Sequence, residues 1–141
     1  MRSRNNFLSA GYLYLDLHTK KLIYASCGHP PLLIWKREEK EFVELKPKGR
    51  LIGIAPDITL HDTVYKLESG DRILFYTDGL IECENGEGIP FGESALHKFA
   101  LAHENLNAQD FSNSLVKSLN SYSATKGTFS DDVTFIVIDV I

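Results

Sequence analysis

Two aspartates, Asp78 and Asp131, lie at positions from which they could share one cation. Asp78 follows the apolar run 72–76, and Asp131 precedes the apolar run 133–140. If these runs form neighbouring antiparallel strands, both carboxylates lie at the same edge of the sheet. Carboxylate oxygens are the ligands that Mg²⁺ and Mn²⁺ prefer. The pattern therefore predicts a site for a hard divalent cation, with Gly79 allowing the backbone to turn sharply beside the ion.

The same residues also have an ordinary structural interpretation. Asp-Gly is one of the commonest turn dipeptides, and an aspartate before a strand is a common cap. The spacing of Asp78 and Asp131 alone does not separate this interpretation from a cation site.

The elements that must position these aspartates are predicted from hydrophobic periodicity. Short runs of β-branched and aromatic residues predict strands at 7–16, 21–26, 32–35, 41–45, 63–67 and 72–76. After Gly92, apolar residues recur at helical spacing and predict two amphipathic helices, with Asn107 and Asp110 as caps near the start of the second. A mostly antiparallel sheet, a helix pair and a closing strand at 133–140 make an α+β fold, and we expect one domain over 1–141.

Composition narrows the possible functions. The chain has 141 residues, of which 43% are hydrophobic and 24% charged, as in one globular domain. With 15 basic and 19 acidic residues the net charge is -4, which argues against a nucleic-acid binder. No apolar stretch is long enough to span a membrane, and the first residues do not form a signal peptide. Only Cys27 and Cys83 are present, without a paired metal or redox spacing, so we expect reduced thiols in a cytoplasmic protein.

Five blocks, in order along the chain, carry a family resemblance. They are Cys-Gly-His-Pro-Pro at 27–31, Leu-Ile-Gly at 51–53, the run from Gly70 to Glu82 with Thr-Asp-Gly at 77–79, Phe-Gly at 91–92 and Ser-Asp-Asp-Val-Thr at 130–134. Together they resemble the bacterial metal-dependent protein phosphatases of the SpoIIE and RsbU type, a branch of the PPM (type 2C) serine/threonine phosphatase family.

The resemblance implies a β-sandwich of antiparallel sheets flanked by helices, with a site for two Mn²⁺ or Mg²⁺ ions at one edge. It maps metal ligands, and thus catalytic residues, onto Asp78 and Asp131, with Asp132 and Gly79 beside them. The ions would activate a water that attacks the phosphorus of a phosphoserine or phosphothreonine without a covalent intermediate. The substrate of such relatives is a regulatory phosphoprotein, a phosphorylated anti-sigma-factor antagonist.

Two further features, His29 and the basic loop that follows residue 45, each have two possible interpretations. By the resemblance, His29 lies close to the catalytic edge, where it could contact phosphate or protonate a leaving group; alternatively, it fixes a strand end by hydrogen bonds. The basic loop containing Lys46, Lys48 and Arg50 could meet an acidic phosphoprotein, or it could simply be solvated.

The sequence departs from the family pattern at its start. The family's Asp-x-Ser-Gly-x-Gly block, whose Asp bridges the two metals, is missing, and residues 1–6 contain no carboxylate. We therefore expect an N-terminally truncated domain that lacks the first strand and helix and is weakly active or inactive alone. The alternative function is a non-catalytic protein-interaction module. A homodimer or another partner is expected to cover the exposed sheet, with no contact to membrane or nucleic acid.

Overall fold

The structure is a computed structural model that describes residues 6–125, 129 and 131–141. The chain divides into two compact units. The first unit comprises residues up to Leu32 together with Glu44–Glu68, and the second comprises Leu33–Val43 and Ser69–Ile141.

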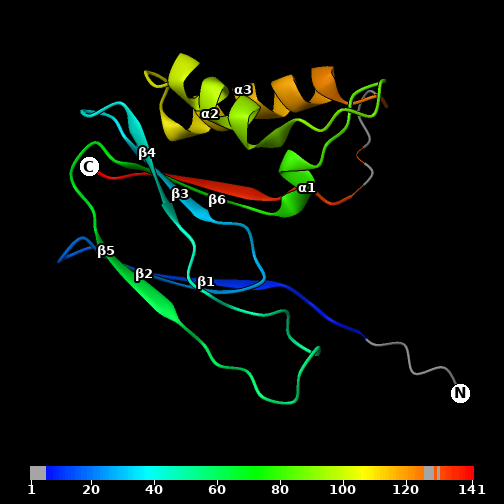
Figure 1. Ribbon diagram of the computed structural model, residues 1–141. Helices are drawn as coiled ribbons and strands as arrows, with labels where there is room; N and C mark the ends of the chain where they lie inside the picture. Colours follow the sequence, from blue (N-terminus) through cyan, green and yellow to red (C-terminus); the bar gives the residue numbers. More distant parts are fainter. Residues whose placement is uncertain (1–5, 126–128, 130) are drawn as a thin grey trace, which may run out of the picture. The chain divides into compact units, whose positions relative to one another are not determined.

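The first unit contains a three-stranded antiparallel sheet in the order β1-β2-β5 (Figure 1). Its strands are β1 (Ala10–Asp16), β2 (Lys21–Cys27) and β5 (Asp62–Lys66). The first two strands pair antiparallel and form a hairpin. The Asp16 side chain closes it by accepting hydrogen bonds from the backbone N–H groups of His18 and Thr19, at 2.9 and 3.1 Å. These bonds favour the ionised carboxylate and lower the pKa of Asp16.

All three strands of this unit differ from their predicted limits, and the third, predicted at 63–67, runs from Asp62 to Lys66. The first was predicted from residue 7 but begins at Ala10, because Leu8 pairs only in an isolated bridge with Ile52. The second ends at Cys27, and Gly28 follows it with a φ of 68°, a conformation that favours glycine. The next strand begins at Leu32, directly after the two prolines.

The second unit contains a four-stranded sheet in the order β4-β3-β6-β7 and three helices (Figure 1). The strands are β3 (Leu32–Lys36), β4 (Glu41–Leu45), β6 (Arg72–Tyr76) and β7 (Phe135–Asp139), and the helices are α1 (Asp78–Ile81), α2 (Gly92–Ala102) and α3 (Ala108–Tyr122). The prediction of antiparallel sheet, helix pair and closing strand is confirmed, and the fold is α+β.

Helices α2 and α3 supply much of the buried core of the second unit. Helix α2 buries Leu96 and Ala100. Helix α3 buries Phe111, Leu115 and Leu119 at the spacing that predicted it. The predicted cap is also confirmed, because the Asn107 side chain accepts a hydrogen bond from the backbone N–H of Asp110 at 2.9 Å.

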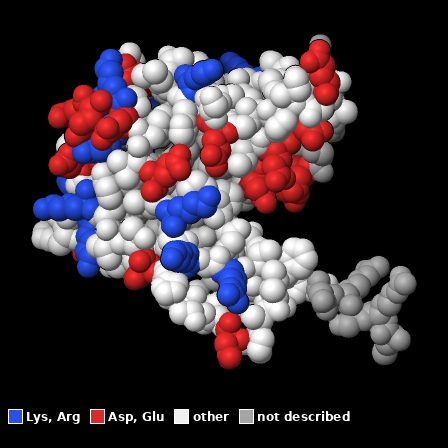
Figure 2. Space-filling view, in the orientation of Figure 1, with Lys and Arg blue, Asp and Glu red and all other residues white. Residues whose placement is uncertain are grey.

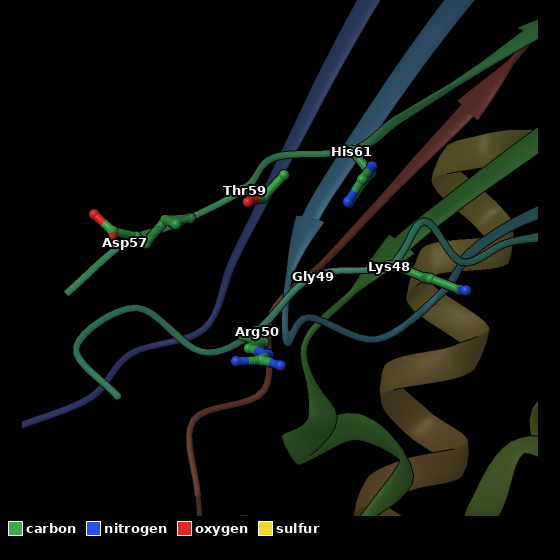
Figure 3. A pocket seen from close by; sticks show the side chains of 7 residues that line it. Lys48, Gly49, Arg50, Asp57, Thr59 and His61 are labelled. Carbon is green, nitrogen blue, oxygen red and sulfur yellow. The ribbon is translucent and has the colours of Figure 1, made fainter. Parts of the chain in front are cut away.

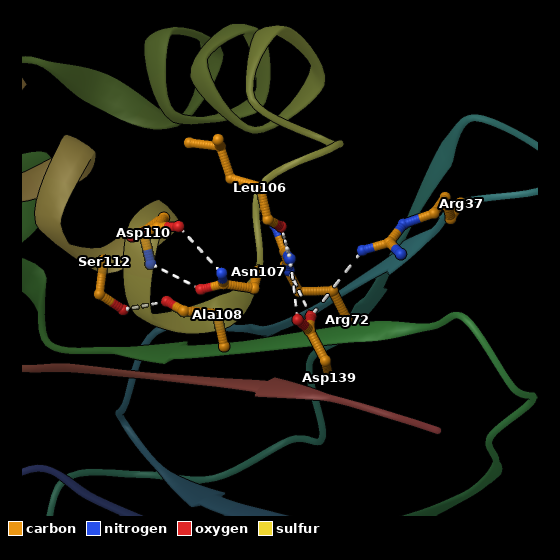
Figure 4. Close-up of polar contacts among 8 residues, drawn as sticks. All are labelled: Arg37, Arg72, Leu106, Asn107, Ala108, Asp110, Ser112 and Asp139. Atoms are coloured by element: carbon orange, nitrogen blue, oxygen red, sulfur yellow. Dashed lines mark hydrogen bonds and ion pairs between the residues drawn. The ribbon is translucent and has the colours of Figure 1, made fainter.

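An ion pair between a buried arginine and a partly exposed aspartate ties β6 to β7 and to the start of α3 (Figure 4). Arg72 and Asp139 are opposite each other in the ladder. Arg72 Nε donates to Asp139 Oδ1 at 2.6 Å, and Nη2 donates to Oδ2 at 3.0 Å and to the carbonyl of Leu106. The guanidinium lies 4.6 Å from the centre of the Phe111 ring. The Arg72 side chain is only 2% exposed, so this cation is held inside the protein by its partners.

In the part of the chain that the structure describes, no helix combines the length and apolar character that crossing a membrane requires.

Candidate metal centre

The edge of the sheet where β6 ends and β7 begins carries both predicted aspartates. The two strands pair antiparallel, with Tyr76 opposite Phe135, so the predicted pairing of the two apolar runs is confirmed. The final strand is shorter than predicted and starts at Phe135 rather than residue 133. Asp78 and Asp131 therefore lie on the two segments that extend from the same end of the ladder.

Thr77 keeps these two segments together beyond the last ladder pair. Its N–H donates to the carbonyl of Thr134 at 2.9 Å, and its Oγ1 accepts from the N–H of Thr134 at 3.1 Å. Its hydroxyl also lies 3.4 Å from the Asp132 carbonyl. No role was predicted for Thr77, although a hydroxyl directly before Asp-Gly is a visible signal for such a cross-link. The two segments are thus fixed relative to each other by hydrogen bonds made by both the backbone and the side chain of Thr77.

Gly79 is the point where the two segments touch. A Cβ at this position would overlap the carbonyl oxygen of Asp132 and would lie 3.7 Å from Cβ of Asp131. The predicted reason for Gly79 was wrong, since it lies in helix α1 and is not among the glycines with positive φ. Close approach requires the glycine here, rather than a sharp turn. The contact establishes that Asp78-Gly79 and Asp131-Asp132 are neighbours.

Both carboxylates are exposed and share the same local geometry. Asp78 Oδ1 accepts from the N–H of Gly79 at 3.1 Å, and Asp131 Oδ1 accepts from the N–H of Asp132 at 2.8 Å. Neither carboxylate forms an ion pair with a lysine or arginine among residues 6–125, 129 and 131–141. Acidic side chains gather over α1 on the face seen in Figure 2. Like charges gathered without a cationic partner favour the binding of a cation.

The donor set fits a hard divalent cation but is incomplete on its own. Asp78 and Asp131 offer carboxylate oxygens, which suit Mg²⁺ or Mn²⁺. Within the described residues, however, no group of three or more histidine, cysteine, aspartate or glutamate side chains could hold a metal ion. Two carboxylates supply little ligand charge, so a strong site would need further ligands. The roles of Asp78, Asp131 and Asp132 at a metal remain predictions.

His29 belongs to the first unit, where it is bonded to the end of strand β2. Its N–H donates to Ser26 Oγ at 3.0 Å, and that hydroxyl donates to the carbonyl of His29 at 3.1 Å. The Tyr24 hydroxyl lies 3.2 Å from His29 Nδ1 and donates to the carbonyl of Pro30 at 2.8 Å. Burial raises the pKa of Tyr24. These contacts favour the interpretation in which His29 fixes the strand end.

Comparison with known proteins assigns the chain to a family. Residues 1–141 match the profile of the family "Stage II sporulation protein E (SpoIIE)". The curated protein "Phosphoserine phosphatase RsbU" of Bacillus subtilis (strain 168) is 28% identical over 132 residues, which cover 94% of this chain but only 38% of RsbU.

Solved structures share the fold. The SiaA-PP2C domain of Pseudomonas aeruginosa superposes with a TM-score of 0.80 at 22% identity, covering 94% of this chain and 52% of that one. The Mn-presoaked phosphatase domain of SpoIIE from Bacillus subtilis gives a TM-score of 0.72 at 14% identity, over 94% of this chain and 56% of that one. The chain thus spans about half of the solved phosphatase domains that it matches. The profile match spans residues 1–141, and the chain therefore belongs to the SpoIIE family.

Proposed function

We propose that this chain is part of a metal-dependent phosphatase domain that removes phosphate from serine or threonine side chains of a regulatory protein. The observation that carries the proposal is the contact between Asp78-Gly79 and Asp131-Asp132. In a chain of the SpoIIE family, it brings two unneutralised carboxylates to one sheet edge. The similarity to a phosphoserine phosphatase supports the reaction class.

Asp78 and Asp131 are the residues that would hold Mn²⁺ or Mg²⁺. When bound, such an ion supplies a Lewis acid for the phosphoryl oxygens and lowers the pKa of a coordinated water. The protein orients both carboxylates through the hydrogen bonds from the Gly79 and Asp132 backbone. Thr77 holds the two segments in register. Because the carboxylates are exposed, a phosphate on a protein surface has access to them.

A second candidate function is a protein-interaction module that keeps the fold without the catalysis. It is favoured by one observation, the absence of any metal-holding group of three or more side chains in the described part of the chain. Such a module would bind a phosphoprotein without hydrolysing it.

Hydrolysis of p-nitrophenyl phosphate in the presence of Mn²⁺ separates the two candidates. We expect weak, EDTA-sensitive hydrolysis that is lost in Asp78→Asn and Asp131→Asn, because each variant removes one ligand charge from a site that is already incomplete. Asp62→Asn, an equally exposed aspartate on β5, is the control and retains the rate. Undiminished hydrolysis in Asp78→Asn contradicts the proposed site. A folded wild-type chain that binds a phosphoprotein but hydrolyses nothing supports the interaction module.

A phosphorylated anti-sigma-factor antagonist is the proposed substrate, in keeping with the similarity to RsbU. The free, buried cysteines Cys27 and Cys83 are compatible with the proposed reducing cytoplasm. The predicted homodimer stays a prediction, and light scattering over a range of concentrations would test it.

A further inference from the structure

A basic pocket lies in the first unit, on the irregular chain between β4 and β5. It has a volume of about 400 Å³ and is lined by residues 48–50 together with Asp57, Ile58, Thr59 and His61 (Figure 3). Two separate segments contribute to it, and neither belongs to a strand or helix. The candidate metal centre uses none of these residues.

We propose that this pocket is a docking site for an acidic segment of the phosphoprotein substrate, a proposal that rests on the proposed function. Lys48 and Arg50 bring two positive charges against one negative charge from Asp57. Neither Lys48 nor Arg50 forms an ion pair within residues 6–125, 129 and 131–141. On a chain with a net charge of -4, two unneutralised cations at one pocket favour a negatively charged partner.

The backbone that carries the two cations is fixed in place. A Cβ at Gly49 would overlap the carbonyl oxygen of Ser26 and would lie 3.2 Å from Cα of Cys27. The segment between Lys48 and Arg50 is therefore packed directly against the end of β2. A cationic side chain on a fixed backbone loses less conformational entropy on binding than one on a free loop. The pocket is thus preorganised at its basic side.

The remaining lining residues indicate a peptide rather than a polyanion. Ile58 is 45% exposed and offers an apolar contact, while Thr59 offers a hydroxyl. Lysine and arginine line the pocket at two positions, Lys48 and Arg50, which is too small a basic surface to follow the continuous phosphate backbone of a nucleic acid. A pocket of this volume accommodates a few side chains, so an acidic residue beside an apolar one fits its chemistry.

Binding of a fluorescein-labelled, glutamate-rich peptide, measured by fluorescence anisotropy, tests the proposal without any need for catalysis. We expect Lys48→Glu/Arg50→Glu to weaken binding at least about 10-fold, because attraction becomes repulsion at the pocket. Lys98→Glu/Lys117→Glu makes the same change in net charge at exposed positions of α2 and α3 and should change affinity less than about twofold. A twin peptide with glutamine in place of glutamate should bind weakly to all forms.

Four outcomes of the binding experiment overturn the proposal. They are equal loss of binding in both double variants, no binding by the wild type, equal binding of the glutamine twin, and complete displacement of the peptide by inorganic phosphate alone. If circular dichroism shows that the glutamate variant is unfolded, Lys48→Gln/Arg50→Gln replaces it, with the same expected direction.

Failure of this proposal is distinguishable from failure of the proposed function. Asp78→Asn should bind the acidic peptide as the wild type does, whether or not the wild type hydrolyses anything. Where the chain is active, the pocket variant should hydrolyse p-nitrophenyl phosphate at the wild-type rate but show a raised KM for an acidic phosphoserine peptide. An equal loss on both substrates would instead place Lys48 and Arg50 in the catalytic machinery and overturn the docking role.

Discussion

The two ends of the β6–β7 ladder differ in whether their charged side chains are paired with an opposite charge. At one end, Arg72 faces Asp139, and the buried guanidinium is paired with the carboxylate. At the other end, Asp78 and Asp131 project from adjoining segments without a cationic partner among the described residues. The same pair of strands thus carries a neutralised pair and two unneutralised like charges. The first arrangement holds the protein together, and the second is suited to receive a cation from outside.

How much stability is lost when a charge is removed at either end of the ladder depends on how deeply the remaining charge is buried. A buried charge that loses its partner keeps the cost of its desolvation, so removing one member of the Arg72–Asp139 pair is expensive. An exposed carboxylate beside a second one loses a repulsion when it is neutralised, at little desolvation cost. Removal of charge should therefore have opposite effects on stability at the two ends.

Breaking the Arg72–Asp139 pair should give the largest effect. We expect Asp139→Asn to lower the free energy of unfolding by about 3–5 kcal/mol, because the Arg72 guanidinium remains buried without its counter-charge. Urea denaturation followed by circular dichroism measures this change. Arg37, 40% exposed and 4.0 Å from the same carboxylate, provides the control, since Arg37→Gln should cost far less. Equal losses in both variants would remove the distinction between buried and exposed charge.

Adding a methyl group at the other end should give the next largest effect. Gly79→Ala is expected to lower the free energy of unfolding by about 1–3 kcal/mol, because its Cβ would overlap the Asp132 carbonyl oxygen. Gly86→Ala is the matched control, since a Cβ there meets no atom within 4 Å. Unchanged stability in Gly79→Ala would mean that the two segments are not packed as described.

Removing the cap of α3 tests how much the stability of the Arg72 end of the ladder depends on the start of this helix. The Leu106 carbonyl, which accepts from Arg72, directly precedes the capping residue Asn107. Asn107→Ala should lower the free energy of unfolding by about 1 kcal/mol, the usual value of such a cap. The double variant with Asp139→Asn tests coupling in the same denaturation experiment. A loss as large as that of Asp139→Asn would assign the stability of this end to the helix cap rather than to the ion pair.

Neutralising the carboxylate edge should give the smallest effect on stability. Asp78→Asn keeps an oxygen that can accept from Gly79 and removes one of two like charges. We expect the free energy of unfolding to stay within about 0.5 kcal/mol of wild type, or to rise slightly, while Mn²⁺ binding measured by calorimetry is lost. A large loss of stability would show that Asp78 has a structural role, as its ordinary interpretation in a turn would suggest.

Much of the second unit could be predicted because its residues follow simple periodicities. The apolar run at 72–76 predicted β6 at its observed limits, and helical spacing predicted the buried faces of α2 and α3. The meeting of Asp78 and Asp131 at one edge required only that the two apolar runs pair antiparallel. Their chemical role came from family resemblance, since an aspartate before glycine is also a common turn.

Features that depend on tertiary contact could not be predicted. Arg72 lies in an apolar run, and nothing in its surroundings along the chain identifies Asp139 as its partner. The segment after Tyr76 begins a short helix rather than the predicted turn, and Gly79 is needed for close approach to a distant segment. The basic pocket forms on irregular chain, where the packing of Gly49 against Ser26, a contact distant along the sequence, helps to fix the backbone.

The hydrogen bonds from Gly79 and Asp132 to the preceding carboxylates make these two amides natural spectroscopic reporters. The chemical shift of an amide proton that faces a carboxylate depends on the charge carried by that oxygen. In a ¹H–¹⁵N correlation spectrum, the two signals should move together on titration with Mg²⁺, ahead of signals elsewhere in the protein. Occupancy of the site would be visible without a substrate and without turnover.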